Sequence, residues 1–106
     1  MKSYSVEITD NALSDMDDIY RHIRDVLQAP GSAAAQYDRI ADEILKLEII
    51  PERYRIPPIP FLQRLGLHRM LVDNYSVFYL VKENRVIVTD VLYNASNFLE
   101  RLGERC

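Results

Sequence analysis

The side chains best suited to chemistry form an arginine, histidine and tyrosine set between residues 53 and 93. Arginine binds phosphate through paired hydrogen bonds, and tyrosine stacks on a base or supplies a hydroxyl. Such a set can cleave RNA without a metal: a base takes the 2′-hydroxyl proton, arginines stabilise the pentavalent phosphorus, and an acid protonates the leaving oxygen. A structural interpretation competes with this one, because Tyr75 fits a core aromatic and Arg69 fits the partner of a carboxylate. The set comprises Arg53, Tyr54, Arg55, Arg64, His68, Arg69, Tyr75 and Tyr93.

Sequence motifs for a metal or a cofactor are missing. The three glycines lie too far apart for a phosphate-binding loop. His22, His68 and the single cysteine, Cys106, lack the spacing of metal ligands. We therefore expect no metal and no cofactor. No long apolar run and no signal-peptide pattern is present, so we expect a soluble, cytoplasmic protein without a membrane partner.

Charge is spread unevenly along the 106 residues. The net charge is −3, which by itself argues against a nucleic-acid partner. Residues 1–45 carry four basic and nine acidic side chains, whereas residues 46–70 carry five basic and two acidic ones. The middle stretch therefore either meets an anion or is a solvated loop whose arginines favour solubility.

The elements that position the set follow from the apolar pattern. Residues 4–8 alternate like a strand, and Thr9 is a candidate cap for a helix that a Pro-Gly turn ends near residue 30. A second amphipathic helix, capped by Ser32, reaches residue 50. In the first helix Asp15 falls toward the solvated face. Its predicted apolar face comprises Leu13, Met16, Ile19, Tyr20, Ile23, Val26 and Leu27.

Three strands are predicted in the second half, over residues 67–72, 75–81 and 85–93. The second of them is apolar on both faces, so we place it centrally in the sheet. A short helix follows at Phe98. The predicted fold class is α+β, with one domain over residues 1–106. An N-terminal strand and an antiparallel helical hairpin pack on a mainly antiparallel sheet, which a three-stranded meander and a short C-terminal helix complete.

Residues 51–66 hold four of the five prolines, which predicts a restrained loop. This loop displays the apolar side chains of Ile56, Ile59, Phe61 and Leu62. Apolar groups on an irregular segment either complete the protein's own core or contact a partner. The sequence leaves both interpretations open.

The order of elements and the local sequence resemble the ParE/RelE superfamily of type II toxin–antitoxin toxins. The resemblance is carried by residues 62–81, with Gly66 before a strand, Arg69 near the strand start, an Asn74-Tyr75 turn and a Phe78-Tyr79 strand core. The strand ending in Tyr93, the N-terminal strand and the hairpin are also typical. The resemblance spans nearly the whole chain and depends on the ordered combination of these features.

The resemblance implies a toxin that a cognate antitoxin neutralises, in a hetero-oligomer of the two proteins. Superfamily members act either on DNA gyrase, as ParE does, or on mRNA at the ribosome, as RelE does. In this sequence Leu71, Ser76 and Asn94 stand where the RelE-like ribonucleases carry basic residues. We therefore favour the action on gyrase. The alternatives are a ribosome-dependent mRNA endoribonuclease and a degenerate, non-catalytic binding module.

The site residues follow these hypotheses. If the chain is a nuclease, we expect Arg69, His68 and Tyr93 to be catalytic. For contact with RNA or another target, the expected residues are Arg53, Arg55, Arg64 and Tyr75. For contact with the antitoxin, the expected residues are Ile56, Ile59, Phe61 and Leu62.

Overall fold

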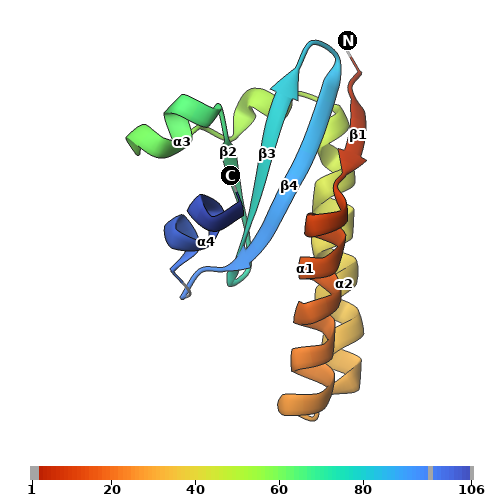
Figure 1. The fold of residues 1–106 in the computed structure, drawn as a ribbon. Coiled ribbons are helices and arrows are strands. Elements are labelled where there is room, and N and C mark those ends of the chain that lie inside the picture. Colours follow the sequence, from red (N-terminus) through yellow and green to blue (C-terminus); the bar gives the residue numbers. More distant parts are fainter. Residues whose placement is uncertain (1–2, 96, 106) are drawn as a thin grey trace.

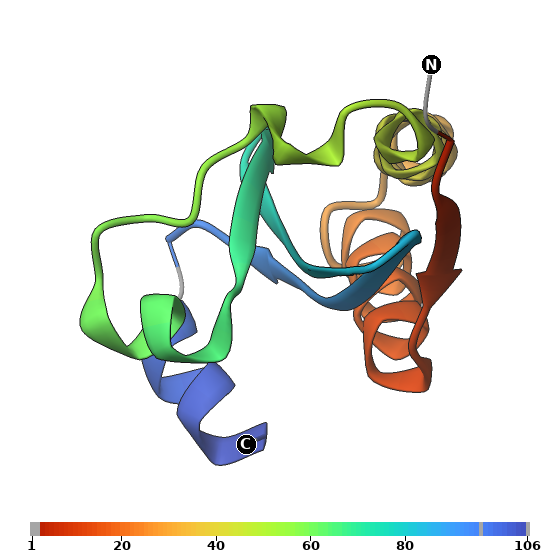
Figure 2. The same ribbon diagram turned by 90° about the horizontal axis from the view of Figure 1, so that it is seen from above.

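A computed structural model describes residues 3–95 and 97–105 of the chain. It consists of a four-stranded sheet with a long helical hairpin on one face and two short helices on the other (Figure 1). Figure 2 views the same layers from above. The main elements in chain order are β1 (Ser5–Ile8), α1 (Asp10–Arg21), α2 (Pro30–Leu45), α3 (Pro60–Leu65), β2 (His68–Val72), β3 (Tyr75–Lys82), β4 (Arg85–Tyr93) and α4 (Phe98–Arg105). The predicted α+β architecture is confirmed.

The sheet has the strand order β1-β4-β3-β2. Strands β2, β3 and β4 form the predicted antiparallel meander, and β1 pairs in parallel with β4. The central position predicted for β3 is also confirmed, because Val77, Phe78 and Tyr79 have no exposed surface. Strand β2 lies at one edge of the sheet and has a strand neighbour on one side only.

The hairpin begins as predicted, since the Thr9 side chain accepts a hydrogen bond from the amide of Ala12 at the start of α1. Its tip differs from the prediction. Residues His22–Val26 form a π-helical turn, and Gln28 has a φ of 52°, so Val26 and Leu27 turn away from the core and are 66% and 60% exposed. The second helix starts at Pro30 and not at Ser32, because proline suits the first helical turn, where its missing N–H is not needed.

The proline-rich segment is more regular than predicted. It contains a 3₁₀ turn at Pro51–Arg53 and the helix α3, which begins at Pro60. Gly66 ends α3 with a φ of 76°, a conformation that side chains with a Cβ rarely adopt. The prediction of a loop throughout was wrong because a proline at the first position of a helix marks its start as well as a break.

Two clusters of buried side chains lie on opposite faces of the sheet. The cluster under the hairpin includes Met16, Ile40, Ile44 and Tyr79. The other lies under α3 and α4, and its members are Leu62, Leu67, Phe78, Leu92 and Leu102, with Ile56, Ile59, Phe61, Leu80 and Phe98 packed against it. The proline-rich segment therefore contributes its apolar side chains to the chain's own second core.

No helix in the described ranges is both long enough and apolar enough to span a bilayer. The one cysteine, Cys106, lies outside the residues that the structure describes.

Candidate functional site

Arg69 lies at the centre of a polar cluster on β2, on the face covered by α3 and α4. Its Nε donates to the Oγ of Ser76 at 2.8 Å, and its Nη2 lies 3.5 Å from the Oδ1 of Asn94. The Ser76 hydroxyl in turn donates to Asn94. The guanidinium also lies over the ring of Phe98, with its central carbon 4.6 Å from the ring centroid. Three neutral neighbours thus hold a half-buried cation in one orientation.

No carboxylate neutralises Arg69 within the described part of the chain. The structural interpretation in which Arg69 pairs with a carboxylate is therefore wrong. Serine hydroxyl and asparagine carbonyl groups accept hydrogen bonds but carry no net charge. The guanidinium keeps unused N–H donors, which suit an anion.

His68 serves a different part of the structure. Its ring stacks on Tyr79, with centroids 5.1 Å apart, and its Nδ1 lies 2.7 Å from the carbonyl oxygen of Tyr54. The Tyr79 hydroxyl donates to the carbonyl oxygen of Pro51 at 2.6 Å, and burial raises the pKa of that hydroxyl above its usual value. His68 and Tyr79 thus hold residues 51–54 against the hairpin side of the sheet.

The structure does not bring Arg69 and His68 together. They are consecutive residues of one strand, so their side chains point to opposite faces of the sheet. Tyr93 lies at the far end of β4 and packs against Tyr75, with ring centroids 5.6 Å apart. Tyr75 belongs to the hairpin-side core, and burial raises the pKa of its hydroxyl, with smaller effects of Tyr93 and Asp73. The predicted catalytic residues therefore share no common centre.

The remaining predicted target-binding arginines lie along the chain before β2. The Arg53 guanidinium donates to the carbonyl oxygen of Ile49 at 3.0 Å and lies over the Tyr54 ring at 5.9 Å. The carbonyl oxygen of Arg55 accepts a hydrogen bond from the backbone amide of Arg69 at 3.1 Å. Arg64 is in the last turn of α3. All three arginine residues are exposed.

The predicted antitoxin contacts differ in their accessibility. Ile56, Ile59 and Phe61 keep some exposed surface, whereas Leu62 is fully buried. A side chain without exposed surface cannot contact a partner unless the fold opens. We therefore leave Leu62 out of any proposed docking surface.

Comparison with known proteins places this architecture in a family. The family model described as the ParE toxin of the type II toxin–antitoxin system parDE matches residues 6–98. The chain belongs to the ParE toxin family. The match runs from β1 to the first residue of α4, and it confirms the superfamily that the sequence resembles.

Two solved structures share the fold of this ParE-family chain. A chromosomal ParDE system from P. aeruginosa is 21% identical, covers 86% of this chain and 96% of its own, and superposes with a TM-score of 0.73. The RelBE2 toxin–antitoxin complex from Mycobacterium tuberculosis is 20% identical, covers 91% of this chain and 97% of its own, and has a TM-score of 0.63. No curated protein sequence matches the chain.

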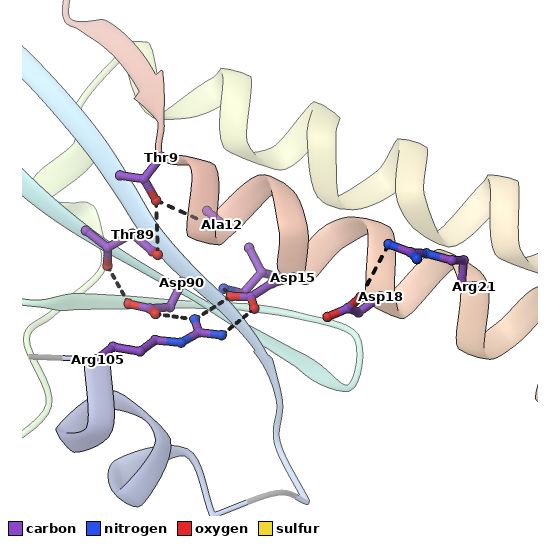
Figure 3. Close-up of polar contacts among 9 residues, drawn as sticks. Thr9, Ala12, Asp15, Asp18, Arg21, Thr89, Asp90 and Arg105 are labelled. Carbon is purple, nitrogen blue, oxygen red and sulfur yellow. Dashed lines mark hydrogen bonds and ion pairs between the residues drawn. The ribbon is translucent and has the colours of Figure 1, made fainter.

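This ParE-family chain also contains an ion cluster that the sequence did not predict (Figure 3). Arg105, in the last turn of α4, reaches Asp15 on α1 with Nη2 to Oδ1 at 2.6 Å and Asp90 on β4 with Nη1 to Oδ1 at 2.5 Å. Asp15 also accepts the backbone amide of Val91 at 2.9 Å. The two carboxylates raise the pKa of the Arg105 guanidinium. One arginine thus ties three elements together.

The burial of Asp15 contradicts its predicted place on the solvated face. The residue is 6% exposed, because β1 pairs with β4 only as far as Val88 and α1 then covers the remaining edge of β4. Thr9 assists there by donating to the carbonyl oxygen of Thr89 at 3.2 Å, whereas Asp18 faces outward and pairs with Arg21 (Figure 3). Asp15 lies three residues after Ala12, so on α1 the two residues share the buried face. Within the described ranges, no group of His, Cys, Asp and Glu is arranged to hold a metal.

Proposed function

We propose that this ParE-family toxin inhibits growth by acting on DNA gyrase and that a cognate antitoxin neutralises it by direct binding. The observation that carries the proposal is the ParE family match over residues 6–98. Inhibition of gyrase by binding needs no bond-breaking chemistry from the toxin. The proposal is therefore consistent with a site in which Arg69 is the one cation with a fixed orientation.

The geometry of the predicted catalytic residues weighs against the ribonuclease alternative. General acid–base cleavage of RNA needs a base and an acid within hydrogen-bond reach of the same phosphodiester. His68 faces the hairpin side and binds a backbone carbonyl, while Arg69 faces the other side. Ser76 and Asn94 occupy positions where basic residues are expected in RelE-like enzymes, and here their uncharged side chains accept hydrogen bonds from Arg69.

A supercoiling assay tests the gyrase proposal. Purified chain is added to gyrase, relaxed plasmid and ATP, with and without the protein encoded by the adjacent reading frame. We expect loss of supercoiling with the toxin alone and recovery when the second protein is present. A matched control is Arg24→Gln, which changes an exposed hairpin side chain paired with its neighbour Asp25, and which should inhibit like the wild type.

Three results would contradict the proposal. If supercoiling stays normal at a large molar excess of toxin, the proposed action on gyrase is refuted. New, codon-phased mRNA ends after induction in cells would instead establish the ribonuclease. Normal growth on expression without any partner would identify a binding module that has lost toxicity.

A further inference from the structure

The turn that follows the hairpin has a backbone conformation that does not suit its residue. Ile50 has a φ of 50° and a ψ of 59°, which is the left-handed region. The other non-glycine residues of positive φ in the described ranges are the polar Gln28, Asp73 and Glu83. A side chain that branches at Cβ is strained in this region, whereas asparagine adopts it readily. Isoleucine therefore makes the folded state less stable than asparagine would.

The packing of the Ile50 side chain does not explain its presence. The residue is 52% exposed and belongs to neither core cluster of the described chain. The turn itself has a structural use, because it brings the carbonyl oxygen of Pro51 to the Tyr79 hydroxyl. Asparagine would serve that turn equally well. Strained residues that the protein's own core does not require are typical of functional sites, so we looked for a contact outside the chain.

Ile50 has two exposed apolar neighbours. Leu45, at the end of α2, is 61% exposed, and Ile49 is 38% exposed. A 3₁₀ turn over Lys46–Glu48 continues the helix between them, and residues four apart on helical turns are surface neighbours. We call Leu45, Ile49 and Ile50 the hairpin-base patch. It lies at the end of the hairpin nearest the N-terminus, since Ser3 pairs with Ile49 (Figures 1 and 2).

An arginine places a positive charge beside the hairpin-base patch. The Nη2 of Arg53 donates to the carbonyl oxygen of Ile49 at 3.0 Å, and its Nε donates to that of Ile50 at 3.4 Å. The guanidinium is thus held against the backbone of the patch. No carboxylate pairs with Arg53 in the part of the chain that the structure describes. Apolar anchors beside an oriented arginine are typical of the energetically important centre of a protein interface.

We propose that the hairpin-base patch is the surface through which the toxin contacts DNA gyrase, at an apolar recess of the enzyme with a carboxylate at its edge. This inference rests on the proposed function, because it names the contact surface for that target. The exposed apolar side chains match a protein surface, and the unpaired Arg53 matches a carboxylate. A second copy of the chain fits less well, because a two-fold interface at the patch would bring two Arg53 guanidinium groups together.

Ile50→Asn tests the proposal, because it should change activity and stability in opposite directions. Asparagine removes the apolar side chain and relieves the backbone strain. In the supercoiling assay, the toxin concentration for half-inhibition should rise roughly tenfold or more, as for the loss of a central interface residue. In a urea titration, the midpoint should equal or exceed that of the wild type. A residue that served only the fold would give a lower midpoint and normal inhibition.

Two matched controls carry the same new residue. Gln28→Asn replaces another residue of positive φ, at the tip of the hairpin, and Val26→Asn removes an apolar side chain that is 66% exposed there. Both variants should inhibit gyrase like the wild type. Arg53→Gln should weaken inhibition by about threefold to thirtyfold, and Arg53→Lys should lose less because the charge remains. Circular dichroism of each variant establishes that it is folded.

The outcomes separate this inference from the proposed function. If Ile50→Asn inhibits gyrase like the wild type, or if Val26→Asn loses as much inhibition, the hairpin-base patch is wrong and the function stands. If the wild type itself leaves supercoiling normal, the proposed function fails and the patch fails with it.

Two further measurements identify a different occupant. If Ile50→Asn inhibits gyrase normally but no longer binds the adjacent-frame protein, the patch is an antitoxin contact and the proposal is overturned. If sedimentation shows a wild-type dimer that Ile50→Asn dissociates without loss of inhibition, the occupant is a second copy and the proposal is likewise overturned.

Discussion

Replacing Arg105 with methionine should destabilise the whole fold, although the residue lies in the last turn of the last helix. The side chain links α4 to Asp15 on α1 and Asp90 on β4 through three short hydrogen bonds. Both carboxylates are 7% exposed at the side chain, and that of Arg105 is 28% exposed. Methionine retains most of the apolar stem and removes only the charge and its donors.

The expected loss follows from what the substitution leaves behind. Breaking a buried ion pair by removing one partner costs about 3–5 kcal/mol, because a charge stays buried without compensation. Two features reduce this cost. Arg105 is partly solvated, and each carboxylate keeps one other donor: the Val91 amide for Asp15 and the Thr89 hydroxyl for Asp90. We therefore expect the free energy of unfolding to fall by about 2–3 kcal/mol, which corresponds to about 10–20 °C in Tm for a domain of this size.

Urea denaturation followed by circular dichroism measures this change. The matched control is Arg101→Met on the same helix, an exposed arginine that should change stability by less than about 0.5 kcal/mol. A double-mutant cycle with Asp90→Asn should give a coupling energy of about 1 kcal/mol or more, since the two residues share a direct bond. If Arg105→Met unfolds at the same urea concentration as the wild type, the ion cluster does not hold α4 in place and the reasoning is refuted.

Three further substitutions test separate parts of the fold by the same urea measurement. Thr9→Ala removes the side-chain cap of α1 and should cost about 1–2 kcal/mol, whereas a loss below a few tenths would contradict the capping role. Gly66→Ala should cost about 1 kcal/mol because the φ of 76° is strained for alanine, while Gly103→Ala, in the open on α4, should be neutral or stabilising. Tyr79→Phe should lose about 1 kcal/mol at neutral pH with the hydrogen bond to Pro51. Because the folded state raises the pKa of Tyr79 above its usual value of 10.0, its contribution is fully present below pH 10 and is lost as the pH rises further, so the wild type should weaken more steeply than Tyr79→Phe in a urea series extended to alkaline pH.

The fold was predictable because its strongest signals are local. The alternation of residues 4–8, the Thr9 cap and the apolar run of β3 each depend on neighbours in sequence, and each appears in the structure as predicted. Two of the errors occur where proline has two local roles, as the end of one helix or the start of the next. Pro60 starts α3 where it was taken to exclude regular structure, and Pro30 starts α2 where it was taken to end the preceding helix.

The candidate site was less predictable than the fold. The sequence singled out Arg69, and the structure places it in a fixed orientation without a carboxylate. The sequence also grouped His68 with Arg69 as candidate catalytic residues near the start of the meander. Consecutive side chains in a strand point to opposite faces of the sheet. His68 and Arg69 are therefore neighbours in the sequence, but their side chains do not share a site.

By itself, the sequence determined the order of the strands and of the two long helices, the central position of β3 and the family to which the chain belongs, but it did not predict α3. Only the tertiary structure decided that Asp15 is buried and that Arg105, 90 residues away, is its partner. It also decided that Ile50 is exposed in a left-handed backbone conformation. The physical reason is the range of the interactions: helix and strand patterns are satisfied by residues a few positions apart, whereas an ion cluster and the exposure of a turn depend on which distant segments the packed core brings together.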